Sequence, residues 1–288
     1  MQDREDTVKR VLLTVAYDGS AYHGWQIQPN GDTIEAQLNT HLSALCGEPI
    51  AVIGASRTDA GVHALGNLTV FDTHARMPAE KFSYALNQRL PEDIRIQKSE
   101  EVAPDFHPRK IQTRKTYEYK IYNAVFPSPI HRLYSHFTYV PLDVEKMRRA
   151  ASFLIGEHDF FSLSTYKPEV ESTVRTVYEM EVLTQPIGNA GIAQIEKGIG
   201  QTERCDEGQN EHTGFRMPQM ITIRVTGNGF LYNMVRIIAG TLLEVGRGRI
   251  SPDAIPSIIE ARDRQLAGPT APACGLTLVC YEVMDGKC

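Results

Sequence analysis

Apolar residues in the first hundred positions recur at two spacings, one typical of strands and the other of helices. Val11 to Ala16 is a β-rich apolar run that predicts a strand. A helix is predicted where apolar residues recur at three- and four-residue intervals: Ile34, Leu38, Leu42 and Leu45. Asp32 and Glu35 have the spacing of a capping box at the start of this helix. The other elements predicted in this part are strands over 52–55, 67–71 and 94–96 and a short helix opening near Pro78.

The rest of the chain repeats this order of elements. Tyr117, Tyr119 and Ile121 alternate with polar residues as in a strand. A helix is predicted over 144–155, with Asp143 as its N-terminal cap and Gly156 at its end. The later elements predicted are strands over 174–182 and 221–225, a long helix over 230–245, a last helix opened by Ser251 and Pro252, and a closing strand over 276–283. We therefore predict an α+β fold with helices on one face of a largely antiparallel sheet, in two similar parts.

The predicted boundary between the two parts divides residues 8–105 from residues 106–288. Within the second part, the segment between Gln185 and Pro218 has six glycines and no apolar period. Such a segment cannot bury enough apolar surface to order itself. We predict a flexible insertion at about 185–218.

Composition limits the class of protein without identifying it. A chain of 288 residues, 42% of them hydrophobic, is long enough for one large domain or two ordinary ones. No apolar run approaches the roughly 18 residues of a membrane helix, and the polar start is unlike a signal peptide. Five cysteines without a C-x-x-C pair argue against a disulfide framework and a zinc site. A cytoplasmic protein with reduced thiols is predicted.

The distribution of charge favours nucleic acid more than its sum does. The net charge of −5 counts against RNA binding, because phosphate contacts need Lys and Arg. The segment 107–120, however, carries five cations against Glu118 alone: Arg109, Lys110, Arg114, Lys115 and Lys120. The tyrosines beside it offer faces on which bases stack. We interpret this segment as a phosphate track, with Arg109, Arg114 and Lys115 as substrate-binding candidates.

The stretch from Gly54 to Ala64 carries the candidate chemistry. If extended geometry persists through Thr58, Arg57 and Asp59 share a face, because side chains two apart on a strand point the same way. An arginine beside a carboxylate favours its ionised form and orients it. Asp59 is then a candidate nucleophile or general base that needs no metal. The alternative is an ion pair that only caps a turn.

These residues also carry a family resemblance. The run from Arg57 to Ala64, R-T-D-A-G-V-H-A, resembles the signature of the tRNA pseudouridine synthase A family. The other matching stretches, in the family's order, are Tyr17-Asp18-Gly19 with Gly24-Trp25-Gln26, Phe106-His107-Pro108-Arg109, Lys115-Thr116-Tyr117-Glu118-Tyr119, Gly156-Glu157-His158-Asp159-Phe160 and Asn228 to Arg236. Together they span roughly residues 11–280, which is nearly the whole chain.

The resemblance implies a fold, a reaction and a set of roles. The implied fold has two ferredoxin-like halves whose sheets join across a central cleft, in a homodimer. The implied reaction isomerises uridine to pseudouridine at positions 38–40 in the anticodon arm of tRNA, without a cofactor. Asp59 matches the catalytic carboxylate, and Tyr117 and Arg236 match active-site positions. Arg57 would orient Asp59 or contact the flipped nucleotide, and His63 would help to bind RNA.

What the sequence lacks agrees with this chemistry but leaves alternatives. It has no dinucleotide-binding glycine loop, Walker loop, H-E-x-x-H or cysteine cluster. A single carboxylate has three routes: attack on the anomeric carbon, removal of the C2′ proton, or addition to C6 of uracil. One rival is a non-catalytic tRNA-binding protein of the same fold. The other is a carboxylate-dependent hydrolase of nucleosides or glycans, which would need a second acid.

Overall fold

The first half of the chain folds as a βαββαβ unit. A computed structural model describes residues 8–166, 170–187 and 217–284. The elements of the first half are β1 (Lys9–Tyr17), α1 (Ile34–Cys46), β2 (Ile53–Gly54), β3 (His63–Thr73), α2 (Phe82–Asn87) and β4 (Ile94–Val102). The strands lie in the order β4-β1-β3-β2, with antiparallel neighbours. This is the order of a ferredoxin-like unit.

The second half repeats that arrangement with additions. Its main elements are β5 (Thr113–Asn123), α3 (Val144–Ser152), β8 (Val174–Pro186), β9 (Gln219–Gly227), α5 (Met234–Gly246) and β10 (Leu276–Val283). The strand order β10-β5-β9-β8 matches that of the first half. The additions are β6 (His136–Thr138) beside β5, β7 (Gly156–Asp159) beside β8, and α6 (Ile255–Ala261).

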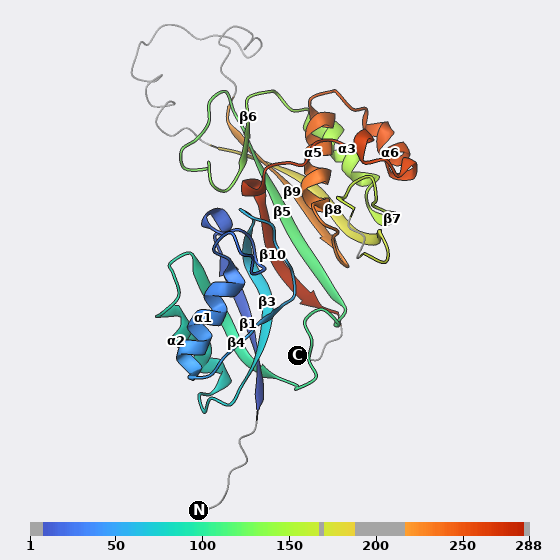
Figure 1. Cartoon of the computed structure of the whole chain (residues 1–288). Coiled ribbons are helices and arrows are strands. Elements are labelled where there is room, and N and C mark those ends of the chain that lie inside the picture. The colour runs from blue at the N-terminus through green and yellow to red at the C-terminus, as the bar shows by residue number, and fades with distance from the viewer. Residues whose placement is uncertain (1–7, 167–169, 188–216, 285–288) are drawn as a thin grey trace, which may run out of the picture.

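The last strand joins the two halves into one sheet. β10 pairs with β5 in antiparallel fashion and runs parallel to β3, where Thr277 faces His63 and Leu278 faces Ala64. In Figure 1, β10 lies between the two halves, with α1 and α2 over the first half and α3, α5 and α6 over the second. The α+β class and the two ferredoxin-like halves are confirmed. The predicted boundary at 105/106 falls in the connection between β4 and β5.

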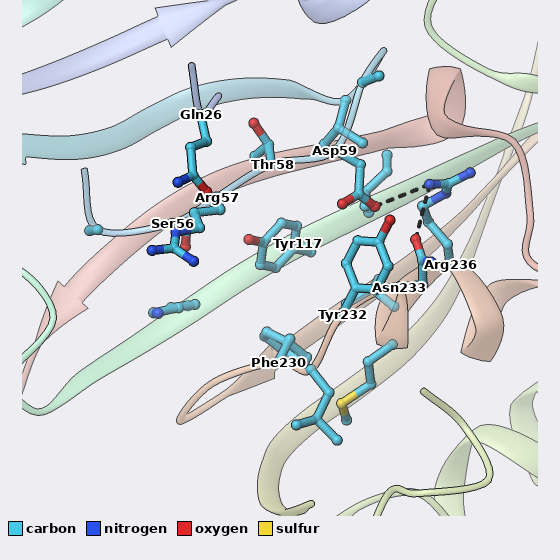
Figure 2. A pocket seen from close by; sticks show the side chains of 18 of the residues that line it. Gln26, Ser56, Arg57, Thr58, Asp59, Tyr117, Phe230, Tyr232, Asn233 and Arg236 are labelled. Atoms are coloured by element: carbon cyan, nitrogen blue, oxygen red, sulfur yellow. Dashed lines mark hydrogen bonds and ion pairs between the residues drawn. The ribbon is translucent and has the colours of Figure 1, made fainter. Parts of the chain in front are cut away.

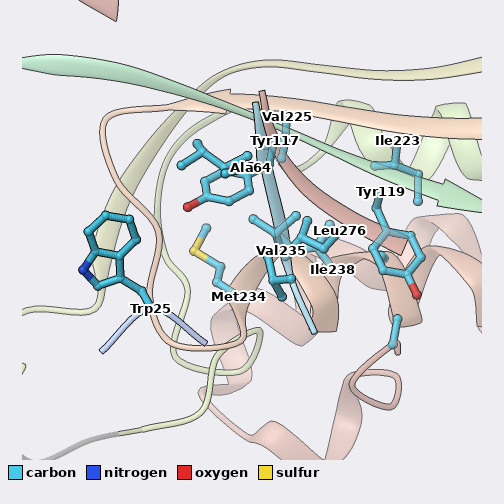
Figure 3. Close-up of a cluster of buried hydrophobic side chains, with 14 of the residues drawn as sticks. Trp25, Ala64, Tyr117, Tyr119, Ile223, Val225, Met234, Val235, Ile238 and Leu276 are labelled. Atoms are coloured by element: carbon cyan, nitrogen blue, oxygen red, sulfur yellow. The ribbon is translucent and has the colours of Figure 1, made fainter. Parts of the chain in front are cut away.

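The helices cover one face of the sheet. Val11, Leu13 and Val15 of β1 belong to the main core, whereas Leu12 belongs to a small cluster on the opposite face. This alternation follows from the two-residue period of a strand. In the second half, Tyr117 and Leu276 of the sheet pack against Val235 and Ile238 of α5 (Figure 3).

Two predicted helices are shorter than their periodicity indicated. The helix predicted over 230–245 begins at Met234, because Asn233 before it adopts a left-handed conformation with φ 60°. Residues 230–233 form a loop instead. The helix predicted over 144–155 is capped by Asp143 as expected but ends at Ser152. Gly156, with φ 113°, opens β7 rather than ending the helix.

The structure describes the two ends of the segment 185–218, where an insertion is predicted. β8 extends to Pro186 and β9 begins at Gln219, and the Ile187 amide donates to the Pro218 carbonyl over 2.8 Å. Both ends of the predicted insertion therefore belong to the β8–β9 hairpin. The rest of it, 188–216, lies outside the described residues.

Within the part of the chain that is described, none of the helices has the length and apolar character needed to cross a membrane.

Candidate active site

Close backbone contacts place the loop that carries Asp59. This loop, residues 55–62, connects β2 to β3. A Cβ on Gly19 would lie 2.0 Å from the Val62 carbonyl oxygen, and a Cβ on Gly24 would lie 2.6 Å from that of Thr58. Only glycine permits such approaches. The glycines of the Tyr17–Gly19 and Gly24–Gln26 stretches therefore let the segment after β1 pack directly against the loop 55–62.

Buried polar side chains hold the loop from behind. The Tyr17 hydroxyl bonds to Oγ1 of Thr58 over 2.7 Å. Asn67, which is fully buried on β3, donates from Nδ2 to the Ser56 carbonyl over 3.0 Å. The Ser56 and Tyr281 hydroxyls bond to each other, which ties the loop to β10. Buried polar groups that are satisfied in this way specify one loop conformation.

Asp59 is held near the N-terminus of α5 by an ion pair. Arg236 donates from Nη1 to Oδ2 of Asp59 over 3.1 Å, and the two side chains are 18% and 20% exposed. The Arg236 guanidinium is itself fixed, because Nε donates to the Ala271 carbonyl over 2.8 Å and Nη1 donates to Oδ1 of Asn233 over 3.2 Å. An arginine held by these two other bonds orients the carboxylate that it binds.

Both halves of the chain line the cleft in which Asp59 lies. The cleft has a volume of about 1000 Å³ and is bounded by the loop 55–62, β5 and the segment 230–236. Tyr117 forms part of it, and its ring meets that of Phe230 edge to face at 5.2 Å. Burial, and then the charge of Asp59, raise the pKa of Tyr117 to about 12, which the Ser56 side chain partly offsets. Figure 2 shows Tyr117 between Asp59 and Arg57.

Comparison with known proteins decides the family. The family model described as tRNA pseudouridine synthase matches residues 13–109 and 150–282. A tRNA pseudouridine synthase A of Ruminiclostridium cellulolyticum is 44% identical over 94% of this chain and 98% of its own. The proteins of that name from Exiguobacterium sp. and Bacillus subtilis are 43% and 42% identical, over 96% and 93% of this chain and 100% and 97% of theirs.

The chain belongs to the tRNA pseudouridine synthase family. This confirms the resemblance read from the sequence and, with it, the prediction of a tRNA pseudouridine synthase, an isomerase. It does not favour the non-catalytic alternative. The match of 150–282 includes Arg236, and the match of 13–109 includes Asp59.

Arg57 does not pair with Asp59 as the sequence indicated. β2 ends at Gly54, so residues 56–59 are irregular and the two-residue rule for strands does not apply. Arg57 is exposed at the opposite end of the cleft (Figure 2). Among the described residues, the ion-pair partner of Asp59 is Arg236. Arg57 still lines the cleft and is placed to contact a substrate.

Two other predicted substrate-binding residues lie away from the cleft. His63 is 4% exposed, with Nδ1 3.1 Å from Oδ1 of Asp18 and Nε2 3.0 Å from the Leu133 carbonyl oxygen. Its side chain therefore connects the segment after β1 to the β5–β6 connection. Arg114 points to the opposite face of β5 from the cleft, because neighbouring side chains on a strand alternate, and its guanidinium lies 4.7 Å from the Tyr178 ring centre.

The cleft contains three further cations, of which the sequence predicted two. Arg109 and Lys115 line it as expected, and Arg109 donates from Nε to the Gly54 carbonyl over 2.7 Å. Arg175, near the start of β8, also lines the cleft and was not predicted, because a lone arginine in a strand gives no signal. Within the described residues, His, Cys, Asp and Glu form no group of three or more suited to a metal ion.

Proposed function

We propose that this chain isomerises uridine to pseudouridine at positions 38–40 in the anticodon arm of tRNA, with Asp59 as its one catalytic carboxylate and no cofactor. The observation that carries the proposal is the Arg236–Asp59 pair, which fixes a carboxylate in a cleft beside an aromatic wall. Because Arg236 engages Oδ2, we assign the reacting oxygen to Oδ1.

The reaction rearranges bonds without any net addition. The bond from C1′ to N1 breaks, the uracil turns, and C1′ bonds to C5 instead. C5 then gives up its proton, and N1 gains one. Asp59 serves this sequence by one of three routes: attack on C1′, removal of the C2′ proton, or addition to C6.

Tyr117 and Phe230 are proposed to receive the base. A uridine must leave the RNA stack to reach Asp59, which costs a few kcal/mol and requires a stacking surface in exchange. The ring of Tyr117 offers that surface beside Asp59. Its pKa of about 12 keeps the hydroxyl neutral, so Tyr117 donates or accepts a hydrogen bond and does not act as a phenolate base.

The partners and location follow from the same proposal. Arg57, Arg109 and Lys115 are placed to contact tRNA from the cleft wall. A homodimer is proposed from the family resemblance, supported by exposed apolar side chains in the β5–β6 connection, where Phe126 is 78% and Ile130 82% exposed. Light scattering across a range of concentrations tests it. A cytoplasmic location is proposed from the predicted tRNA substrate.

Release of tritium tests the reaction itself. Transcripts labelled with tritium at C5 of uridine lose the label only when the new carbon–carbon bond forms. We expect release by the wild type and none by Asp59→Asn, with tRNA binding and thermal unfolding nearly unchanged. Asp72→Asn is the matched control, because Asp72 pairs with Arg10 at the surface, and it should release tritium normally.

Each contrary outcome has a distinct meaning. Full release by Asp59→Asn would show that Asp59 is not the catalytic group. No release by the wild type, with tight tRNA binding, would make the protein an RNA binder. Loss of the folded state in Asp59→Asn would assign the Arg236 pair a structural role.

A further inference from the structure

Four cations gather in the cleft without a carboxylate to pair with. Arg57, Arg109, Lys115 and Arg175 come from the loop 55–62, the connection before β5, β5 and β8. Within the described residues, none of them lies within ion-pair distance of an Asp or Glu, and the influence of Glu35 on Arg109 is long-range. Several arginines elsewhere are paired with carboxylates, for example Arg149 with Asp253 at 2.6 Å and Arg10 with Asp72 at 2.7 Å.

Lys115 and Arg175 are partly removed from water, whereas Arg57 and Arg109 are more exposed, and the four cations repel one another. Burial, followed by the charges of Arg175 and Arg109, lowers the pKa of Lys115 to about 8. Burial and then Arg57 lower the pKa of Arg109, and burial lowers that of Arg175. Desolvated like charges cost free energy unless an anion joins them. The free protein therefore holds a site whose strain a bound anion would relieve.

The cluster lies at the opposite end of the cleft from Asp59. The Lys115 ammonium is 5.2 Å from the centre of the Tyr281 ring, and the Tyr281 hydroxyl bonds to Ser56, the residue before Arg57. Figure 2 shows Arg57 and Gln26 on one side of Tyr117, and Asp59 with Arg236 on the other. An anion bound among the cations is thus separated from the catalytic carboxylate by the tyrosine ring.

We propose that Arg109, Lys115 and Arg175 form a subsite for one backbone phosphate of the tRNA, with Arg57 at its edge, on the far side of Tyr117 from Asp59. This inference rests on the proposed function. The phosphate fixes the sugar–phosphate chain at one end of the cleft while the base of the target nucleotide reaches Asp59 at the other. The bound phosphate replaces the repulsion that Lys115 feels from its neighbours with an attraction, and this holds the ammonium protonated.

Proton uptake follows from that reversal. Well below pH 8 the Lys115 side chain is already charged, so binding takes up no proton there. Above pH 8 the free protein must gain a proton to bind phosphate, so affinity falls as pH rises. Between pH 7 and 9 the Kd for tRNA should rise about tenfold. Two tyrosines, Tyr117 and Tyr281, lie beside Lys115. Both have raised pKa values and stay neutral in this range.

The experiment measures tRNA affinity against pH, in the Asp59→Asn background to prevent turnover. Lys115→Arg keeps its charge at every pH and should lose the Lys115-dependent part of the pH response. Lys115→Gln should lose it too, bind more weakly, and show a slope of log Kd against log salt reduced by about one. Arg175→Gln should also weaken binding and move the midpoint of the pH response upward, because Arg175 no longer repels Lys115.

Matched controls remove the same charges elsewhere. Lys120 lies on the same strand as Lys115 and is paired with Glu118 at 3.7 Å, and Arg149 is paired on α3. Lys120→Gln and Arg149→Gln should leave the pH response unchanged. Thermal unfolding of free Lys115→Gln adds a second readout. A cation in a repulsive site destabilises the free protein, so its removal should leave Tm unchanged or raise it while affinity falls.

The results separate this inference from the proposed function. A wild type that releases tritium but shows the same pH response as Lys115→Arg would overturn the phosphate subsite and leave the isomerase intact. Weaker binding by Lys115→Gln with an unchanged salt slope would assign Lys115 to a base rather than a phosphate, and would also overturn it. No tritium release by the wild type would count against the proposed function instead.

Discussion

Arg236 and Asp59 are 177 residues apart in the sequence and 3.1 Å apart in the structure, measured from Nη1 to Oδ2. The pair joins the first βαββαβ unit to α5 of the second. It also depends on Ala271 and Asn233, which fix the guanidinium. The orientation of the candidate catalytic carboxylate is therefore a property of both halves together.

Arg236→Lys tests that orientation. A lysine keeps the charge but has a single nitrogen, so it cannot bond to the Ala271 carbonyl and to Asp59 as the planar guanidinium does. We expect kcat to fall by about 100-fold, the usual effect of losing one preorganised donor, with little change in tRNA Kd. Single-turnover rates measure it. Arg224→Lys, in the surface pair with Glu118, is the control, and a wild-type rate for Arg236→Lys would contradict the role.

Tyr117 separates the contribution of a ring from that of a hydroxyl. Tyr117→Phe keeps the edge-to-face contact with Phe230 and the stacking surface, so the loss in single-turnover rate should be less than about tenfold. Tyr117→Ala removes the surface and should weaken the transition state by about 1–3 kcal/mol, the range for one stacked base. Equal losses in the two variants would show that the hydroxyl, and not the ring, is what the reaction needs.

Gly19 and Gly47 distinguish close packing from backbone conformation. A Cβ at Gly19 meets the Val62 carbonyl at 2.0 Å, whereas Gly47 has φ +72° and open space around it. Gly47→Ala should cost about 1 kcal/mol of unfolding free energy, from the left-handed conformation alone. Gly19→Ala should cost about 3 kcal/mol or more and reduce activity, because the loop that carries Asp59 must shift. Urea unfolding and tritium release measure both, and similar costs would contradict the packing argument.

His136 makes stability depend on pH in one direction. Burial, and then the charge of Arg247, lower its pKa below the ordinary histidine value of about 6.5. The neutral form is therefore favoured in the folded state, and this stability is present above about pH 6.5 and lost as pH falls below it. The loss should not exceed about 1.4 kcal/mol per pH unit. Denaturant unfolding between pH 7.5 and 5.5 should show a smaller decline in His136→Gln than in the wild type, and parallel curves would contradict this.

Local patterns in the sequence predicted many of the helices and strands. The α1 helix follows from the spacing of its apolar residues, although its N-cap is Thr33, inside the predicted capping box. The strands of both halves follow from alternation, as at Tyr117, Tyr119 and Ile121. These elements are set by a face that must be buried, and a face is visible in a single sequence.

Contacts between distant segments were not visible in the same way. The sequence paired Asp59 with Arg57, its near neighbour, and only the packed structure shows that Arg236 takes that place. Arg175 had no local signal, since its importance comes from lying near Lys115 on another strand. The start of α5 was misplaced because Asn233 adopts a conformation that apolar periodicity does not encode.

The position of β10 also sets the order of events during synthesis. Because residues 276–283 stand between β3 and β5, the strands of the two halves cannot join into one sheet until the last strand has left the ribosome. Domains fold as they emerge, with the N-terminal part first. A nascent chain that stops before Leu276 therefore carries Asp59, Tyr117 and Arg236 but lacks the strand that joins the two halves around the cleft.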